Sequence, residues 1–242
     1  MIRAFQKGVV PIAKIQIFGE RCSGTNFLES LLQANIRPDI LTSEFGWKHW
    51  FRSDTAARRS PECLFLVIYR NAAEWLKSFH RNPWHAAPEL KEIPRRQFLR
   101  GEWHSVFDEV SEYPPGHPLW HTDIRGDLDP QTGARFRNVI AMRNAKVAHF
   151  ESLRKRFDNV CYLRYEDLRA DPEGCIRVIA ARYGLPLPDS FQPAVAYKGY
   201  GRAYAPHSYT PLDLGERIFI LRQLNLLQEY RIGYSPLSIL RS

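Results

Sequence analysis

Three short apolar runs, each followed by a stretch with helical spacing, set the pattern of the chain. The runs cover residues 12–18, 64–69 and 160–164 and are rich in β-branched and aromatic side chains, which is typical of buried strands. A further short strand is expected near Phe45–Phe51. Because strands and helices alternate, the pattern predicts an α/β fold with a central parallel β-sheet flanked by helices.

The stretch after each run places apolar residues on one helix face. Asp171 and Pro172 stand where an N-cap and the first helical residue are expected for the third of these helices. Two more helices are predicted, one from about Ala134 to Phe157 and one from about Leu214 to Tyr230. The predicted faces are Phe27, Leu28, Leu31 and Leu32; then Ala72, Trp75, Leu76 and Phe79; then Ile176, Ile179, Ala180 and Tyr183.

The regular pattern fails between residues 84 and 134, where prolines, glycines, histidines and charged residues crowd together. So long an irregular stretch is uncommon in a compact domain unless it shapes a site. We therefore expect one α/β domain over residues 1–242, with about 84–134 as an insertion that covers the acceptor side of an active site.

Composition and charge narrow the class of protein. The hydrophobic content of 44% and the charged content of 25% are ordinary for a globular protein. The net charge of +8 fits a polyanionic partner: nucleic acid, anionic glycan, membrane surface or a multiply phosphorylated cofactor. No apolar run approaches the length of a membrane-spanning helix, and the first residues lack a cleavage signal, so we expect a cytoplasmic protein without a transmembrane segment. The four cysteines show no paired spacing, which indicates reduced thiols and no zinc site.

The segment GERCSGTN, residues 19–26, joins the first strand to the first helix. At such a junction the free N–H groups of the helix face an anion. The phosphate loop of nucleotide triphosphatases needs a lysine and a hydroxyl that holds magnesium, and Thr25 and Asn26 stand in those places, so we expect no bound metal. Cys22 is interpreted as a small turn residue, because a phosphatase-type thiol loop would need an arginine where Leu28 stands.

This segment resembles the 5′-phosphosulfate loop of sulfotransferases that use 3′-phosphoadenosine-5′-phosphosulfate (PAPS). The resemblance implies a P-loop-like sulfotransferase fold and PAPS as co-substrate, with Arg21 and the backbone N–H groups of residues 23–26 on the phosphosulfate. Cys22 falls where the family has a lysine, and Phe27 matches a residue that stacks on adenine. The cofactor-binding residues that the resemblance implies in this loop are Arg21, Cys22, Ser23, Gly24, Thr25, Asn26 and Phe27.

Two later segments are similar to further elements of the same family. In LFLVIYRNAAEWLKSFHRNP, Arg70 and Ser78 match the residues that bind the 3′-phosphate. In YLRYEDLRADPEGC, Tyr165 matches a residue that approaches the adenine. Lys198-Gly199 and Arg202 are faintly similar to a late loop that closes over the 3′-phosphate.

Sulfuryl transfer to a hydroxyl needs a group that removes the proton and cations that stabilise the leaving phosphate. The segment FGWKHWF offers Lys48 and His49, which resemble the lysine and catalytic histidine of the family. Neighbours on a strand point to opposite faces, so we expect one of the two to enter the site. We favour His49 as the base because an imidazole side chain, whose unperturbed pKa is about 6.5, suits proton transfer at neutral pH, with Lys48 and Arg21 as cations. Glu29 and Glu44 are alternative bases, although Glu29 is expected to face solvent.

The predicted insertion combines tryptophans and arginines, a composition that suits sugar rings or anionic acceptors, or a lid packed by its own aromatic side chains. His80 is placed near the acceptor, and Arg143 and Lys146 share a helix face toward the site or toward solvent. The tryptophans and arginines meant are Trp84, Trp103, Trp120, Arg95, Arg96, Arg100 and Arg125.

The sequence thus predicts a PAPS-dependent sulfotransferase. Its acceptor is a hydroxyl, with a carbohydrate favoured and a small alcohol, a phenol or a lipid-linked metabolite possible, and no nucleic-acid partner is expected. The first alternative is a small-molecule kinase on the same fold, which the missing lysine disfavours. The second is a non-catalytic protein that binds nucleic acid or an anionic glycan, which the net charge of +8 would serve.

Overall fold

The computed structural model describes residues 2–6, 10–51, 60–110, 112–194, 196–197, 202–203 and 207–241. The chain forms two compact units. The first consists of Met1–Asn71 and Phe150–Ser208, and the second of Ala72–His149 and Tyr209–Ser242.

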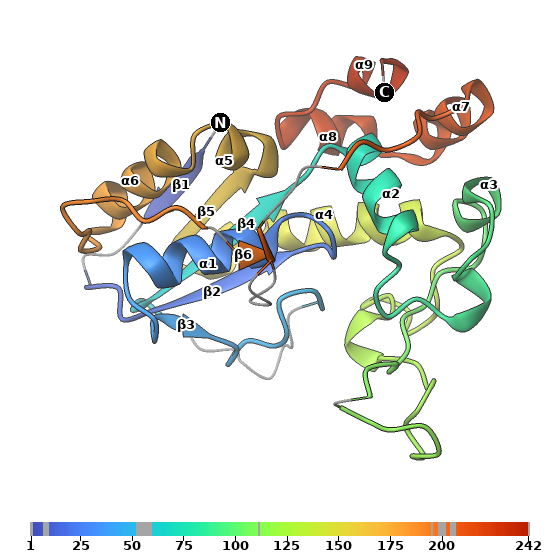
Figure 1. Cartoon of the computed structure of the whole chain (residues 1–242), viewed down its shortest axis with the longest axis horizontal. Helices are drawn as coiled ribbons and strands as arrows, with labels where there is room; N and C mark the ends of the chain where they lie inside the picture. The colour runs from blue at the N-terminus through green and yellow to red at the C-terminus, as the bar shows by residue number, and fades with distance from the viewer. Residues whose placement is uncertain are drawn as a thin grey trace. The chain divides into compact units, whose positions relative to one another are not determined.

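The first unit is built on a five-stranded mixed sheet with the strand order β1-β5-β4-β2-β3 (Figure 1). The expected α/β class is therefore confirmed, but the sheet is not entirely parallel, because β1 pairs antiparallel with β5. The other three pairings are parallel. The strands are β1 (Arg3–Gln6), β2 (Lys14–Gly19), β3 (Leu41–Thr42), β4 (Cys63–Tyr69) and β5 (Asn159–Arg164).

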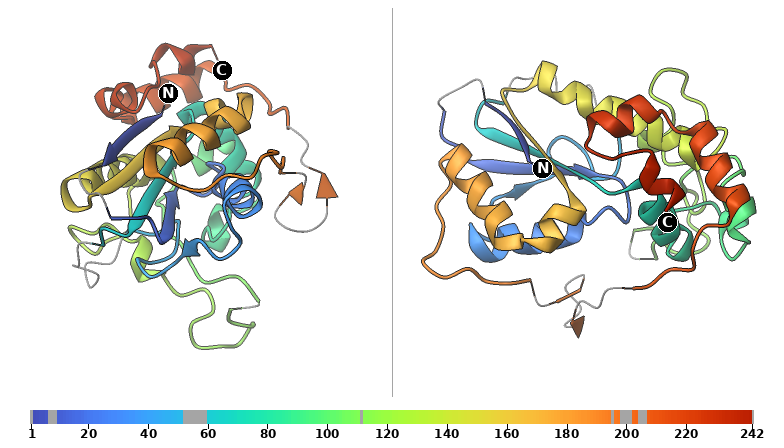
Figure 2. Two further views of the ribbon diagram at one scale, coloured as in Figure 1. Left: turned by 90° about the vertical axis from the view of Figure 1, so that its left-hand side faces the viewer. Right: turned by 90° about the horizontal axis from the view of Figure 1, so that it is seen from above.

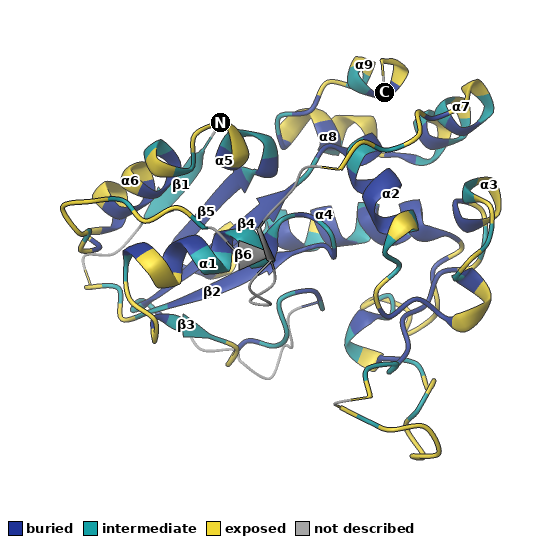
Figure 3. Ribbon diagram, in the orientation of Figure 1, coloured by how far each residue is buried: buried dark blue, intermediate teal, exposed yellow. Residues whose placement is uncertain are grey.

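Helices cover the sheet of the first unit on both sides. Every residue of the central strand β4 is buried (Figure 3), as expected for a strand with both faces covered. The apolar faces of α1 (Thr25–Asn35) and α6 (Pro172–Tyr183) share one core with the sheet, and α5 (Tyr165–Ala170) joins it. On the opposite face, Phe65 stacks on Phe157 with ring centroids 3.9 Å apart.

The prediction of a strand near Phe45–Phe51 is wrong. The strand of this region is β3, whose Leu41 pairs with Ile15 of β2, and the following residues make two tight turns. Gly46, with φ of 103°, adopts a conformation that excludes it from a regular strand. Aromatic residues suggested a strand here, but the turns decide the local structure.

Two of the predicted helices have different bounds. The helix expected from Ala134 begins later, as α4 (Val139–Arg156), because the Asn138 side chain accepts hydrogen bonds from the N–H groups of residues 140 and 141 and caps it. The helix expected over Leu214–Tyr230 is divided into α7 (Leu214–Gln223) and α8 (Leu226–Arg231). Asn225 caps the second piece by accepting from the N–H of residue 228. The cap predicted at Asp171 is confirmed for α6.

The second unit combines helices with the irregular segment predicted over residues 84–134. Its elements are α2 (Ala72–Arg81), η1 (Pro88–Leu90), α3 (Arg95–Phe98), η2 (Arg125–Asp127), the first part of α4, α7, α8 and α9 (Leu237–Leu240). Figure 2 shows α7, α8 and α9 close to one another in red. A two-stranded sheet of β6 (Ala196–Tyr197) and β7 (Arg202–Ala203) belongs to the first unit.

Buried ion pairs hold the second unit together. Arg143 donates two hydrogen bonds to the Glu229 carboxylate at 2.7 and 2.9 Å, and Lys146 pairs with Asp127. All four side chains are at most 3% exposed, so Arg143 and Lys146 do not face solvent, contrary to one of the two expectations from the sequence. Among the residues described, no helix is both long and apolar enough to cross a bilayer.

Candidate anion-binding site

The motif residues of the first unit follow the ends of three neighbouring parallel strands. Gly19 at the end of β2 lies opposite Ile68 of β4, and Tyr69 at the end of β4 lies opposite Arg164 of β5. The loop after β2, Arg70 after β4 and Tyr165 after β5 are therefore brought to one edge of the sheet. The carboxyl edge of parallel strands is where α/β proteins bind their ligands.

The N-terminus of α1 is open at this edge. Its N-cap is Gly24, with φ of 98° and ψ of 15°, and among the described residues no side chain caps the helix. A Cβ on Gly24 would lie 2.3 Å from Cδ2 of Tyr165, so only glycine fits between the helix and this ring. The first N–H groups of a helix have no acceptor within it, and the positive end of the helix dipole lies there. Thr25 and Asn26 supply such groups.

Ser23 adds a buried hydroxyl to the loop. Its backbone N–H donates to the Glu20 carbonyl at 3.1 Å, so the backbone donors that can serve an anion begin at Gly24 and not at Ser23. The Ser23 side chain is fully buried, and its Oγ has no hydrogen-bond partner in the described part of the chain. A buried hydroxyl of this kind costs free energy unless a ligand or water satisfies it.

Two arginines lie close to the loop backbone. Arg21 is 3% exposed, and its guanidinium carbon is 5.4 Å from the ring centroid of Trp47. Arg70 donates from Nη1 to the Cys22 carbonyl at 2.9 Å, and its guanidinium lies 4.9 Å from the Tyr165 ring centroid. Tyr165 thus packs against Gly24 and beside Arg70.

Cys22 occupies a special backbone position at the tip of the loop. Its φ is 62°, in the left-handed region that non-glycine residues seldom adopt. The side chain is partly exposed, whereas Cys63 and Cys161 are buried in the sheet, and burial raises the pKa of each of these two thiols to about 12. Phe27, on the first turn of α1, is half-buried against the core of the first unit.

His49 and Lys48 lie in a turn that is bonded to the end of β2. Gly19 donates its N–H to the Lys48 carbonyl at 3.0 Å, and its carbonyl oxygen is 2.7 Å from Nδ1 of His49. A carbonyl oxygen can only accept, so His49 carries a proton on Nδ1, and in the neutral ring Nε2 is the basic nitrogen. His49 is 7% exposed.

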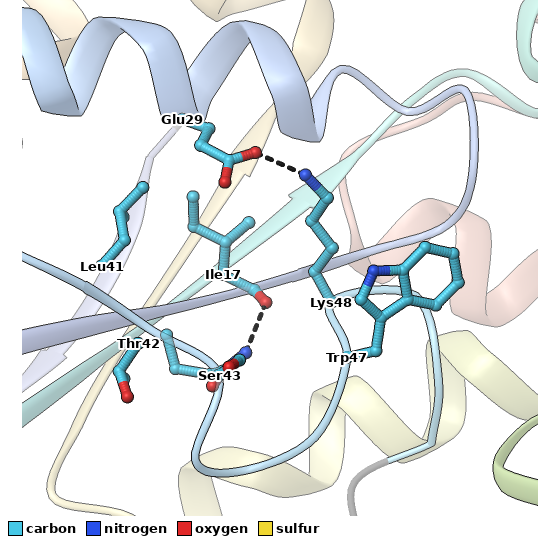
Figure 4. A pocket seen from close by; sticks show the side chains of 8 residues that line it. Ile17, Glu29, Leu41, Thr42, Ser43, Trp47 and Lys48 are labelled. Carbon is cyan, nitrogen blue, oxygen red and sulfur yellow. Dashed lines mark hydrogen bonds and ion pairs between the residues drawn. The ribbon is translucent and has the colours of Figure 1, made fainter. Parts of the chain in front are cut away.

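Lys48 connects the turn to α1. Its Nζ donates to Oδ1 of Asn26 at 2.7 Å and forms an ion pair with Glu29 (Figure 4). Glu29 therefore faces Lys48 and is only 34% exposed, which corrects the expectation that it faces solvent. Glu44 pairs instead with Lys14 and is 60% exposed. The hydrogen bond from Lys14 lowers the pKa of Glu44, so Glu44 is a poor base.

A small cavity lies beside this ion pair. Its volume is about 130 Å³, and Figure 4 shows Lys48, Trp47 and Glu29 at its border together with Ile17 and Leu41. Gln16 donates to the Ile17 carbonyl at 3.0 Å within the lining. The cavity is too small for a nucleotide, but a single hydroxyl-bearing group would fit.

Ser78 belongs to the second unit, where it is 5% exposed and accepts a hydrogen bond from the Tyr209 hydroxyl at 3.0 Å. Its predicted role on the 3′-phosphate stays a prediction. His80 bonds through Nε2 to the Ile93 carbonyl at 2.8 Å, which gives it a structural partner. Lys198 and Gly199 lie outside the described residues, and Arg202 is described only by its backbone.

The tryptophans and arginines named for the insertion differ in how far they are buried. Trp103 is fully buried and packs against Phe98 of the insertion and against Phe79 of α2, so part of the insertion is anchored by an aromatic core that it shares with α2. Trp84 is 40% exposed. Arg95 pairs with Glu216 at 2.7 Å, whereas Arg96, Arg100 and Arg125 are exposed and Trp120 is partly exposed.

A histidine and a lysine surround one carboxylate of the insertion. Nδ1 of His85 lies 2.9 Å from Oδ1 of Asp108, and Lys91 pairs with the other oxygen. Burial alone would raise the pKa of Asp108, but the hydrogen bonds and positive charges of these two residues outweigh it and lower the pKa. Glu109 is close enough to complete a group of three metal-type ligands, yet Lys91 already supplies the positive charge.

Three residues of the sites were not predicted from the sequence. Trp47 lies below Arg21, Tyr209 bonds Ser78, and Glu166 accepts from the Asn71 N–H at 2.9 Å directly after Arg70. Glu166 directly follows Tyr165 in the same motif, and this position is the sequence feature that could have indicated a role for Glu166 at the site. No protein-family model matches the chain, and the comparison with curated proteins finds no match.

Proposed function

We propose that the protein is a sulfotransferase that moves the sulfuryl group of PAPS to a hydroxyl of an acceptor. The observation that supports this best is the meeting of the uncapped N-terminus of α1, the buried Ser23 hydroxyl and Arg70 at one strand edge. The loop has the backbone of an anion site but lacks the lysine and magnesium ligand of a nucleotide triphosphatase. A nucleotide with two separate anionic groups, which needs neither the lysine nor the magnesium ion, fits this set of residues.

In the proposed reaction, the N–H groups of Gly24, Thr25 and Asn26 and the Ser23 hydroxyl bind the 5′-phosphosulfate. Arg70 is assigned to the 3′-phosphate, because its guanidinium offers forked donors at the end of β4. Tyr165 lines the adenine side. Arg21 and Lys48 are assigned to the charge that develops on the leaving phosphate, which their positive charges would stabilise.

His49 is assigned as the general base. Its Nδ1–H is held by the Gly19 carbonyl, so Nε2 can accept the proton of the acceptor hydroxyl. As that proton leaves, the hydroxyl oxygen forms a bond to sulfur, and the bond between sulfur and the 5′-phosphate oxygen breaks with its electron pair. The products are the sulfated acceptor, adenosine-3′,5′-bisphosphate and a protonated His49.

Calorimetry with adenosine-3′,5′-bisphosphate tests the cofactor assignment. Arg70→Gln removes charged hydrogen bonds of about 1.5–3 kcal/mol, so we expect about 10- to 150-fold weaker binding. Arg177→Gln is the matched control, because Arg177 lies on the surface of α6, where it pairs with Glu173 at 2.7 Å. Absence of binding to the wild-type protein, or tight binding of ATP with magnesium in its place, would refute the proposal and favour a kinase.

His49→Asn tests the base. An asparagine amide can donate to the Gly19 carbonyl in place of Nδ1–H but cannot accept a proton, so cofactor binding should be retained. Transfer from radiolabelled PAPS to hydroxyl acceptors should fall roughly 10²- to 10⁴-fold. Equal transfer by the variant would remove His49 from the reaction, and binding without any transfer by the wild-type protein would indicate a non-catalytic binder.

A further inference from the structure

The three C-terminal helices of the second unit expose an unusual number of apolar side chains. Twelve large apolar side chains are exposed in the described part of the chain, and seven of them lie within residues 214–240. Figure 3 shows exposed positions along α7, α8 and α9. The seven are Leu214, Ile218, Leu226, Leu227, Tyr230, Leu237 and Leu240, with Tyr230 70% and Leu214 69% exposed.

These side chains repeat at helical spacing. Leu214 and Ile218 are four residues apart on α7, and the pairs on α8 and α9 are three residues apart, so each pair shares one side of its helix. Ile220 on α7, Ile232 directly after α8 and Ile239 on α9 are buried, whereas these leucines, Ile218 and Tyr230 are exposed. The helices thus keep apolar side chains exposed in addition to the apolar residues that are buried in this segment.

Within positions 214–241 the exposed charged residues are all positive, and the exposed N-cap of α7, Asp213, pairs with Arg96. The only acidic residues between positions 214 and 241 are Glu216 and Glu229, and both are buried in ion pairs, with Arg95 and Arg143 respectively. Three arginines of the same segment are exposed: Arg222, Arg231 and Arg241. The surface therefore combines exposed leucines and an exposed tyrosine with arginines that form no ion pair with a carboxylate of the described residues.

We propose that the exposed side of α7–α9 is a docking face for the surface of an anionic phospholipid membrane. Apolar side chains would enter the boundary between headgroups and acyl chains, Tyr230 suits that boundary, and the arginines would contact lipid phosphates. The helices have only 10, 6 and 4 residues, so they would lie on the membrane and not cross it.

The charges also distinguish a membrane from a second copy of this chain. In a two-fold dimer the same face would meet itself, and the arginines of both copies would be brought together without carboxylates. An anionic bilayer supplies the opposite charge over the same area. This inference rests on the second unit alone and does not depend on the proposed sulfotransferase activity.

Co-sedimentation of the full chain with lipid vesicles tests the proposal. We expect binding to phosphatidylcholine vesicles that contain phosphatidylserine and much weaker binding to phosphatidylcholine alone. The double variant Leu227→Gln, Tyr230→Gln should weaken binding by about 10-fold or more. Val178→Gln is the matched control, because Val178 is 51% exposed on α6 in the first unit. Unchanged circular dichroism and melting would show that the variants fold.

A charge variant distinguishes membrane binding by the exposed side of α7–α9 from binding through the net charge of +8 of the whole chain. Arg222→Gln with Arg231→Gln should lower binding to the anionic vesicles by about 5-fold for each arginine and leave binding to neutral vesicles unchanged. The proposal is overturned if the wild-type protein does not sediment with anionic vesicles or if the leucine and tyrosine variant binds like the control. It is equally overturned if ultracentrifugation shows a dimer that this variant converts to a monomer, because the occupant is then a second copy.

Discussion

The close approach of Gly24 to Tyr165 gives the sharpest test of the candidate site. Ala at position 24 would place its Cβ 2.3 Å from Cδ2, 2.9 Å from Cε2 and 3.3 Å from Cγ of Tyr165. Non-bonded carbon atoms are normally about 3.5–4.0 Å apart, so the ring or the loop must move. In addition, φ of 98° is unfavourable for any residue with a Cβ.

Substitution of Gly46 separates the backbone strain of a positive φ from the steric clash with Tyr165. The φ of 103° at Gly46 is nearly the same as that of Gly24, but a Cβ there would meet nothing within 4 Å. Gly46→Ala should therefore cost only the backbone strain, about 1–2 kcal/mol, less the gain of about 0.4–1 kcal/mol from a stiffer unfolded chain. Gly24→Ala carries the same net strain plus about 1–3 kcal/mol of overpacking, a total of about 1–5 kcal/mol.

Urea denaturation followed by circular dichroism gives the free energy of unfolding of each variant. In a double-mutant cycle, Tyr165→Ala removes the ring, so Gly24→Ala in that background should cost no more than Gly46→Ala does. If Gly24→Ala and Gly46→Ala destabilise the protein equally, or if Tyr165→Ala gives no rescue, the packing of the loop against this ring is not as described here.

Three further predictions concern stability and reactivity. Glu229→Gln should destabilise the protein by about 3–5 kcal/mol in the same denaturation assay, because Arg143 is fully buried, whereas Glu173→Gln in an exposed pair should cost about 0–1 kcal/mol; equal costs would contradict the burial of the first pair. The pKa of Asp108 is lowered in the folded state, so the contribution of its carboxylate to the free energy of unfolding is present above the unfolded pKa and is lost as pH falls through the folded pKa. Asp108→Asn should therefore destabilise the protein at neutral pH and progressively less in acid. A loss of stability that does not depend on pH would argue against the lowered pKa. Ellman's reagent should react rapidly with one thiol of the native protein and with none in Cys22→Ser, and a second rapid thiol would show that one of the three buried cysteines is more accessible than its burial indicates.

The strands and the site loop could be predicted because local signals determine them. Continuous apolar runs identified β2, β4 and β5, and the residues that directly follow them form the candidate site. The antiparallel strand β1 gave no such signal, because its four residues are only half-buried and two of them are polar. Its place in the sheet depends on pairing with β5, more than 150 residues later along the chain.

Charged residues show the same limit on local reasoning. Arg143 and Lys146 have the appearance of a solvated helix face in sequence, yet their partners come from other segments: Glu229 from α8 and Asp127 from η2. Burial of such a charge is tolerated only when a partner of opposite charge lies within reach. The sequence near the helix contains no information about these partners, so its local pattern could not predict the burial.

The turn that carries His49 shows how a wrong local prediction can leave a site prediction intact. On a strand, Lys48 and His49 would point to opposite faces, and only one could serve the site. In the turn, Gly19 binds both residues through its backbone, with its N–H on the Lys48 carbonyl and its carbonyl oxygen on Nδ1 of His49. The backbone of β2 thereby fixes the tautomer of the proposed base before any ligand binds. Lys48 reaches Asn26 on α1, so the proposed base and the helix N-terminus are positioned from the same strand end.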